Sequence, residues 1–358
     1  MRQKVAMVMK LPGLLFTLCL SLSQVQAQPS ALPAAAWDGP RSGPARQAGS
    51  HRILFIAQDL RNGGIVGSYR AFNSAAALLG WQVQVQDAQG NAVQLHKAFA
   101  AAIAARVDGI VLGGFPVSDM AEEVAAAQSA HIVLLGWHAA AQPGIVPGLF
   151  FNVSSDPLEV ARRAASYVVQ NSQGKAGVVI FNDERFDIAN AKTRFMQEMI
   201  QHCSGCKMLT VENLPLNSAE QGMEMAVKRL NQRFGTRWTH TLAINDVYFD
   251  EMNYPLLHAG REDIRNVSAG DGSSKAISRI RAGVSQQMAT VAEPLGVQGW
   301  QLADEMNRAF AGAKPSGYVS KPILITHELL QHLGQQDIDA GQPYQAVYRA
   351  IWSGQPAH

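Results

Sequence analysis

Three glycines in the stretch AQDLRNGGIVGSYRAF, residues 57–72, follow a short apolar run and precede a helical pattern. A phosphate-binding loop of the Walker type would end in Gly-Lys-Ser/Thr, because the lysine contacts the phosphates and the hydroxyl holds magnesium. Here the corresponding residues are Gly67-Ser68-Tyr69. Gly63, Gly64 and Gly67 also lack the Gly-x-Gly-x-x-Gly spacing of a dinucleotide site. Two interpretations remain, namely a turn that uses glycine's conformational freedom and the edge of a site for another ligand.

Catalytic and metal-binding spacings are missing from the rest of the sequence. Ser273 and Ser274 lack the flanking glycines of a nucleophile elbow. The ten histidines show no His-Glu-x-x-His spacing. Asp246 and Asp271 could act as an acid–base pair, but carboxylates that cap helices or face solvent are far more common. We therefore expect no enzyme activity, no cofactor and no metal ion, with an exported hydrolase as a distant alternative.

Two cysteines stand close together in HCSGCK, at Cys203 and Cys206. In an oxidising compartment this spacing favours a local disulfide. A thioredoxin-like redox pair would open a helix after a strand, whereas this motif follows the helical pattern of residues 188–202. A zinc site needs four ligands, and only His202 stands nearby.

The N-terminus is typical of a secretory signal peptide over residues 1–27. Its basic start, apolar stretch and small-residue cleavage site lie at Arg2, Lys4 and Lys10, at 11–22 and at 25–27. The apolar stretch is well short of the ~20 residues of a membrane span. Bulky Phe16 and Leu18 disfavour a lipid anchor on Cys19. We therefore expect export to the periplasm.

The composition of the mature chain excludes some partners. Removing three basic and no acidic residues takes the formal charge from +2 to −1, with 27 basic against 28 acidic residues left. This balance gives no electrostatic footprint for nucleic acid. About 330 residues exceed one usual core, so we expect two domains. Residues 28–50 are rich in Pro, Ala, Gly and Ser, which predicts a disordered leader.

From residue 51 onward, short runs of Val, Ile and Leu alternate with helical patterns. Such runs are typical of strands buried on both faces, and repeated strand–helix units require parallel sheets with right-handed crossovers. Ten or more strands are too many for one ordinary sheet. We therefore predict an α/β fold with two doubly wound parallel-sheet lobes, and a closed eight-fold barrel is the alternative. The predicted helices include 68–79, 92–106, 118–129, 188–202, 218–234, 249–258, 273–282 and 297–310.

Polar and aromatic side chains follow the predicted strand ends, where open parallel sheets bind ligands. Trp137 closes one strand, and its ring could pack on the C–H face of a sugar while Asn and Asp side chains bind the hydroxyls. A core tryptophan is the structural alternative. Arg185 and Phe186 are the corresponding candidates in the second half, against a solvated loop. We expect His138 to make a local hydrogen bond rather than to bind metal.

The order of these pieces resembles the periplasmic sugar-binding proteins of the ribose/galactose type, the ligand-binding components of ABC importers. The resemblance covers residues 52–330. It depends on the motifs NVSSDPLEVARRAASYV, AINDVYFDEM, VSAGDGSSKAISRIRAG and MATVAEPLGVQGWQLAD taken together. It implies a type I periplasmic binding protein fold, in which two lobes joined by a three-segment hinge close on the ligand. The resemblance places the crossings near 152–153, 293–294 and 319–321.

The resemblance also implies ligand-binding positions. Asn245 and Asp271 match an Asn and an Asp that bind sugar hydroxyls in the family, Glu293 stands at a polar hinge position, and Asn62 matches a first-lobe contact. Other positions differ from the family. The family's Pro and aromatics after that Asn are replaced by 63–65, its Asp-Arg pair by 136–137, and a second-lobe Arg by Asn190. We expect Trp137, Phe186 and Tyr248 to supply the missing ring faces.

The resemblance divides the chain into an N-terminal lobe (51–152 and 294–318), a C-terminal lobe (153–293 and 319–330) and a tail (331–358). It implies a monomeric periplasmic protein that delivers a small polar, sugar-like ligand to a membrane permease. A sugar phosphate or sugar acid stays open, because the N–H groups at the helix start near Ser68 could bind an anion. The alternative function is a sensory protein that presents its ligand to a chemoreceptor or a membrane histidine kinase.

The tail carries apolar residues at helical spacing. They are Tyr344, Val347, Tyr348, Ile351 and Trp352. Such a helix could dock a partner, which would favour the sensory function, or it could pack on its own lobe.

Overall fold

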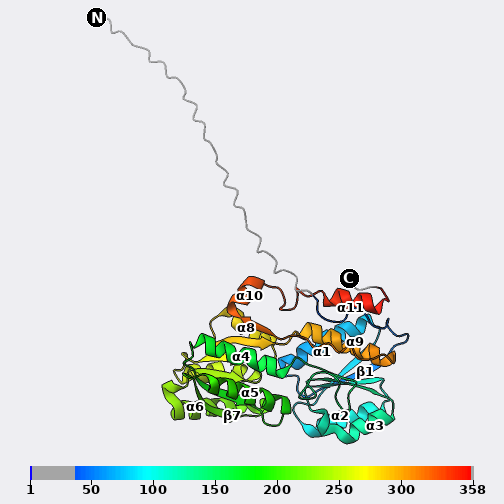
Figure 1. Ribbon diagram of the computed structural model, residues 1–358, viewed down its shortest axis with the longest axis horizontal. Helices are drawn as coiled ribbons and strands as arrows, with labels where there is room; N and C mark the ends of the chain where they lie inside the picture. The colour runs from blue at the N-terminus through cyan, green and yellow to red at the C-terminus, as the bar shows by residue number, and fades with distance from the viewer. Residues whose placement is uncertain (2–36, 356–358) are drawn as a thin grey trace. The chain divides into compact units, whose positions relative to one another are not determined.

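Two open sheets organise the protein. The computed structural model describes Met1 and residues 37–355, so the predicted signal peptide, apart from Met1, and residues 28–36 lie outside the described residues. One sheet has five strands in the order β2-β1-β3-β4-β5, and the other has six in the order β11-β10-β9-β8-β6-β7 (Figure 1). The strand pairs are parallel, apart from β10 with β11. The two-lobe α/β prediction is therefore confirmed, and the closed barrel is excluded.

The N-terminal lobe is built on the five-stranded sheet. Its strands are β1 (Arg52–Ala57), β2 (Gln82–Asp87), β3 (Gly109–Gly113), β4 (Val133–Trp137) and β5 (Phe151–Val153). Helices α1 (Gly63–Leu78) and α9 (Leu295–Phe310) cover one face, and α2 (Ala92–Ala104) and α3 (Ala121–Ser129) cover the other (Figure 1). Because both faces are covered, Val111 and Leu135 point into one apolar cluster while Ile110 and Leu134 point into the second.

The C-terminal lobe follows the same plan. Its strands are β6 (Gly177–Asn182), β7 (Lys207–Asn213), β8 (His240–Ala243), β9 (Arg265–Ser268), β10 (Gln287–Ala292) and β11 (Ile323–Thr326). Its helices are α4 (Pro157–Asn171), α5 (Asp187–His202), α6 (Ala219–Phe234), α7 (Val247–His258), α8 (Ser274–Ala282) and α10 (His327–Leu333). Helix α4 begins with Asp156 as its N-cap, which accepts a hydrogen bond from the Leu158 N–H, and with Pro157 in the first turn.

Three segments join the lobes close to the predicted positions. The chain passes from β5 to α4 after Val153, from β10 to α9 through Glu293 and Pro294, and from α9 to β11 after Phe310. Strand ends, helix starts and these crossings therefore meet in one region between the two sheets.

The structure corrects two expectations about the ends of elements. Helix α1 begins at Gly63 and not at 68, because Asn62 acts as its N-cap and accepts a hydrogen bond from the Gly64 N–H. Residues 37–50 are not a disordered leader. Trp37 is buried beside Tyr318 and Tyr348, and the Asn307 amide donates to the Pro44 carbonyl. The apolar ring of Trp37 anchors a segment whose remaining composition indicates disorder.

The tail forms helix α11 (Tyr344–Trp352), at the predicted helical spacing. Its apolar residues are buried against α9 and do not form a free docking face.

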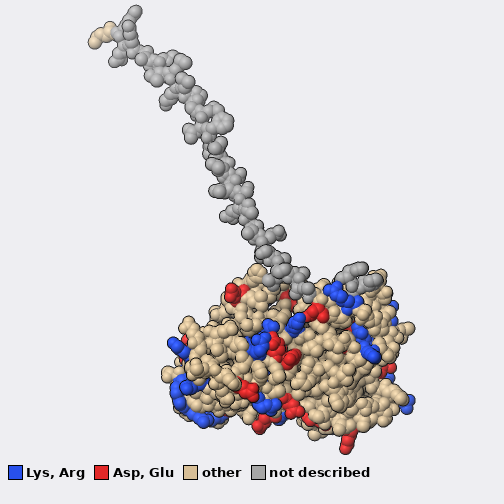
Figure 2. All heavy atoms as spheres, in the orientation of Figure 1, with Lys and Arg blue, Asp and Glu red and all other residues tan. Residues whose placement is uncertain are grey.

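A disulfide joins Cys203 to Cys206 just after α5. Among the described residues, no helix combines the length and apolarity needed to cross a bilayer. On the face drawn in Figure 2, basic groups gather over the α6 end of the C-terminal lobe, and both signs are mixed elsewhere.

Candidate ligand-binding cleft

A small cavity of about 60 Å³ lies where the strand ends of the two lobes face each other. The N-terminal lobe lines it with Gln58, Asn62, Ile65, Gly114, Trp137 and His138, and the C-terminal lobe with Phe186, Ile188, Ala189, Lys192, Leu216, Ile244, Asn245 and Asp271. A larger hollow of about 950 Å³ lies on the C-terminal lobe, beside the first residues of β9 and β10. We take the small cavity as the site, because parallel sheets bind ligands beyond their carboxyl ends.

The glycines of the opening stretch explain how the lobes approach each other here. A Cβ atom on Gly64 would lie 2.4 Å from Asp271 Oδ2, and one on Gly63 would lie 2.5 Å from the Ser273 side chain. Only a residue without a side chain allows this contact between the start of α1 and the loop after β9. The stretch is therefore the N-terminal edge of the cleft, and glycine is needed for close approach rather than for phosphate binding.

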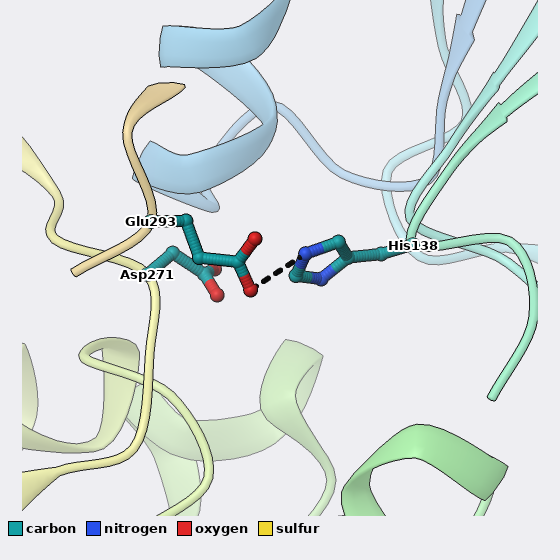
Figure 3. Close-up of side chains that lie close together, drawn as sticks. All are labelled: His138, Asp271 and Glu293. Carbon is teal, nitrogen blue, oxygen red and sulfur yellow. Dashed lines mark ion pairs between the residues drawn. The ribbon is translucent and has the colours of Figure 1, made fainter. Parts of the chain in front are cut away.

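Three titratable side chains face one another in the cleft, as Figure 3 shows. His138 Nε2 lies 2.9 Å from Glu293 Oε1, with the two side chains only 9% and 1% exposed. This contact has the length of an ion pair but not the geometry of a hydrogen bond, so both atoms lack a hydrogen-bond partner among the described residues. Single ligand atoms of His138, Glu293 and Asp271 lie within 4.8 Å of one another. Polar atoms this buried are strong candidates for contacts to a bound ligand.

Glu293 is held in place from both lobes. Its Oε2 accepts hydrogen bonds from the Ser155 N–H, at 3.1 Å, and from the Gln298 amide. Gln298 Oε1 in turn accepts from the Trp137 indole at 2.8 Å. Burial alone would raise the pKa of Glu293, but the nearby His138 and Lys192 cations and these donors lower it well below the usual value. Glu293 therefore stays ionised at the hinge.

Asp271 comes from the loop after β9, and its Oδ2 accepts a 2.6 Å hydrogen bond from the Asn245 amide. Burial raises its pKa, and His138, Lys192 and Asn245 act against that rise. Asp246 holds the same loop, because its Oδ2 accepts from the N–H groups of Gly272 and Ser273. Asn245 and Asp271 are thus adjacent, where the resemblance places two sugar-binding positions.

Lys192 is a cleft residue that the sequence did not single out. It is 3% exposed, lies on α5, and donates from Nζ to the Ala269 carbonyl at 2.8 Å. It lies one helical turn after Ile188, which also lines the cavity. A lysine on the same helix face as Ile188 and Ala189 is the one signal that could have found it.

Of the three aromatic candidates, two line the cavity and one does not. Trp137 and Phe186 line the cavity, but the Trp137 ring is 1% exposed and stacks on the His138 imidazole, with centroids 4.1 Å apart and planes at 8°. Tyr248 lies inside the C-terminal core, where its hydroxyl donates to the Leu214 carbonyl. The expectation that Tyr248 supplies a ring face to the ligand is therefore wrong, because its position on α7 turns it to the sheet.

Two other predicted residues do not line the cavity. Arg185 forms a two-pronged pair with Asp183 and is 42% exposed. Asn190 Oδ1 accepts from the Asn182 amide, and its own amide donates to the Glu184 carbonyl. Both side chains stabilise the loop after β6, and their polar groups form hydrogen bonds within the C-terminal lobe. Gln58, Ile65, Leu216 and Ile244 line the cavity instead and carry no distinctive sequence signal.

A metal ion has one possible set of ligands among the described residues, the His138–Asp271–Glu293 group. Its donor types would suit a divalent cation. However, the buried amine of Lys192 already supplies a positive charge close to both Asp271 and Glu293. The charge of the cavity therefore gives no reason to place a cation there.

The comparisons with known proteins agree with this architecture. Residues 53–314 match the family model described as the periplasmic binding protein domain. A search among curated proteins found no sequence that matches the chain.

Solved structures share the fold at low identity. A sugar ABC transporter protein from Yersinia enterocolitica has a TM-score of 0.71 at 17% identity, covering 85% of this chain and 96% of its own. The Caulobacter myo-inositol binding protein, bound to myo-inositol, has 0.69 at 20%, covering 81% and 97%. An Agrobacterium vitis ABC transporter solute-binding protein with bound allitol has 0.69 at 18%, covering 79% and 98%. The family match spans well over half of the sequence, and the chain belongs to the periplasmic binding protein family.

Proposed function

We propose that this protein captures a small, neutral polyhydroxy compound between its two lobes and delivers it to an ABC importer permease. The observation that carries the proposal is the convergence of Asn62 and His138 from one lobe with Asn245 and Asp271 from the other on one cavity. Glu293, from the crossing between the lobes, lies against the same group. Such an arrangement lets the ligand join the lobes by bonding to both of them.

The chemistry of the cavity favours hydroxyl groups. Carboxylates accept hydrogen bonds, while Lys192 and the Asn245 amide donate them, and a hydroxyl can satisfy either kind of partner. Ile65, Phe186 and Leu216 add apolar surface for C–H groups. The proteins with similar structures support this class, since their bound molecules include allitol and myo-inositol.

Two features favour a neutral ligand over a sugar phosphate or a sugar acid. Asp271 and Glu293 already place two carboxylates beside the single amine of Lys192, so an anion would add a further buried negative charge. The start of α1 is also occupied. The Asn62 side chain accepts from the Gly64 N–H, and the Asp271 carboxylate lies directly against Gly64. An anionic ligand would have to compete with Asp271 for the positive end of this helix.

The size of the cavity favours a small ligand. Its volume of about 60 Å³ is far below the roughly 300–1,000 Å³ of drug-sized pockets.

We propose that the protein works as a monomer in the periplasm after removal of residues 1–27, and that it is not an enzyme. The tail gives no support to the sensory alternative, because the apolar face of α11 is buried against α9.

Thermal melting of residues 28–358 against polyols, sugars, sugar acids, sugar phosphates and nucleosides tests this function. A ligand at a hundredfold its Kd adds about 2.7 kcal/mol of stability, which raises Tm by several degrees. We expect stabilisation by one neutral polyol or sugar, with allitol and myo-inositol as the first compounds. Stabilisation by anions alone, or by no member of the panel while the protein is folded, would overturn the proposal.

A further inference from the structure

The C-terminal segment makes a fourth passage between the lobes. Helix α10 packs on α8 in the C-terminal lobe, whereas α11 packs on α9 in the N-terminal lobe. Figure 1 shows α10 beside α8 and α11 beside α9. Residues 334–343 connect the two helices, so the chain returns to the first lobe after the three crossings of the hinge.

The C-terminal lobe holds one end of this segment by apolar packing. Leu333, the last residue of α10, and Ile338 both pack against a cluster that contains Ile280 and Leu330. Ile280 lies on α8, which begins directly after the cleft loop that carries Asp271. The segment is therefore attached to the part of the lobe that moves with the cleft loop.

The N-terminal lobe holds the other end through Asp339, which is 8% exposed. A Cβ atom on Gly296 would lie 2.3 Å from Asp339 Oδ2, so the carboxylate lies directly against the first turn of α9. Burial raises the pKa of Asp339, and the backbone N–H groups at Val297 and Gly296 oppose that rise. An acidic side chain at this position stabilises the start of a helix.

Aromatic packing then fixes the rest of the tail on the same helix. Tyr344 contacts the Trp300 ring edge-on, with centroids 5.9 Å apart, and Trp352 stacks on Trp300 at 5.5 Å. The Trp352 indole donates to Asp304 Oδ1 at 2.9 Å. Detaching α11 would expose these rings and remove the donor to Asp304 Oδ1, while Oδ2 keeps its hydrogen bond from Arg308.

The two anchors leave no slack between the lobes. Ile338 packs in the C-terminal lobe, and the next residue, Asp339, lies against Gly296 at the start of α9 in the N-terminal lobe. Helix α9 begins two residues after Glu293, whose carboxylate lies in the cleft. From this arrangement we propose that residues 334–343 are a fourth hinge segment that restrains the separation of the two lobes.

The restraint follows from the geometry of opening. Separating the lobes moves the Asp271 loop and α8 away from Gly63 and Gly64 on α1. Because Ile338 moves with α8 while Asp339 stays on α9, a large rotation must break one of the two anchors. The protein is therefore held near the closed arrangement before ligand arrives. This inference needs the two-lobe fold but not the identity of the ligand.

An insertion variant tests whether the short connection between the two anchors, rather than their packing, restrains the lobes. Six Gly/Ser residues between Ile338 and Asp339 give slack while leaving both anchor residues in the chain. The same six residues after Gly144 are the matched control, because Ile145 is 75% exposed in a loop within the N-terminal lobe. Small-angle scattering of the ligand-free mature proteins measures the radius of gyration. We expect an increase of roughly 1 Å on a radius of about 20 Å for the first insertion only.

A point substitution gives an independent measurement. Asp339→Ala removes the contact to α9, whereas Asp339→Asn keeps an acceptor at the helix start. We expect the ligand-free radius to rise in Asp339→Ala and to return to the wild-type value in Asp339→Asn. If the insertion and Asp339→Ala proteins are folded by circular dichroism and have the wild-type radius, the fourth segment does not restrain opening and the proposal is wrong. A binding panel that fails would instead count against the proposed function alone.

Discussion

The two lobes share one architecture but bring different chemistry to the cleft. The N-terminal lobe contributes Asn62, Trp137 and His138, which are an amide, an indole and an imidazole. The C-terminal lobe contributes the buried charges of Lys192 and Asp271. We expect the C-terminal lobe, whose loops at the strand ends hold buried charged and amide side chains, to make the strongest contacts to the ligand. We expect the N-terminal lobe to shape and cover the cavity. Substitutions of the C-terminal-lobe residues in the cavity should therefore change the affinity more than substitutions outside the cavity.

The largest expected effect is that of Asp271→Asn. It removes an ionised acceptor from the cavity, and a hydrogen bond to a charged group contributes about 1.5–3 kcal/mol. We expect the affinity for the ligand found in the melting panel to fall about 100-fold at 3 kcal/mol, as measured by calorimetry. The unliganded protein should melt at an equal or higher temperature, because the buried carboxylate is lost. Asp263→Asn, on a 56% exposed side chain, is the control, and equal affinity in the two variants would move the site elsewhere.

Lys192→Met sharpens the comparison with a smaller change. The substitution keeps the length of the side chain but removes its charge and its donor to Ala269. We expect about a tenfold loss of affinity, in line with one lost hydrogen bond of about 1.4 kcal/mol. Lys228→Met, on the exposed face of α6, serves as the matched control and should bind as the wild type does. An unchanged affinity for Lys192→Met would mean that this amine serves the Ala269 loop alone.

The pH dependence of stability tests the coupling between the buried carboxylates. Burial, followed by the charge of Asp271, raises the pKa of Asp246 to about 6. A carboxyl with a raised pKa binds more protons in the folded state, so the stability it contributes below its unfolded pKa is lost as pH rises toward 6. Glu293 acts in the opposite sense, since its lowered pKa contributes stability that is lost only at acidic pH.

We therefore expect the pH 5 minus pH 7 difference in Tm to be smaller in Asp271→Asn than in the wild type. The reason is that the substitution removes the second cause of the Asp246 shift and also the raised pKa of Asp271 itself. Calorimetry at both pH values measures the difference, and comparing the two proteins cancels other groups such as His240, whose pKa burial lowers. The same difference in both proteins would show that Asp246 and Asp271 titrate independently.

The smallest effect on binding is expected outside the cavity. Tyr248→Phe removes the hydrogen bond to the Leu214 carbonyl and should lower the unfolding free energy by about 1 kcal/mol. Its affinity should stay within twofold of the wild type, because the ring faces the C-terminal core. Denaturant titration and calorimetry measure the two quantities. A large loss of affinity with unchanged stability would return Tyr248 to the list of ligand contacts.

Particular residues show how far the sequence could predict the site. Asn62, Trp137, His138, Phe186, Asn245, Asp271 and Glu293 follow or flank strand ends and lie at the cleft. Arg185, Asn190 and Tyr248 also follow strand ends but bond within their own lobe. Position after a strand predicts which edge of the sheet a residue occupies. It does not predict whether its polar group already bonds to another residue of the same lobe, as Arg185 does to Asp183, Asn190 to Asn182 and Tyr248 to Leu214.

The sequence by itself determined the α/β fold with two parallel-sheet lobes, because hydrophobic periodicity and chain connectivity are local properties. It also determined the disulfide-compatible spacing of Cys203 and Cys206. Only the tertiary structure decided that Lys192 enters the cleft, that Gly63 and Gly64 serve close approach between lobes, and that the tail returns to the first lobe. These features depend on contacts between residues far apart in the chain, which no local pattern encodes.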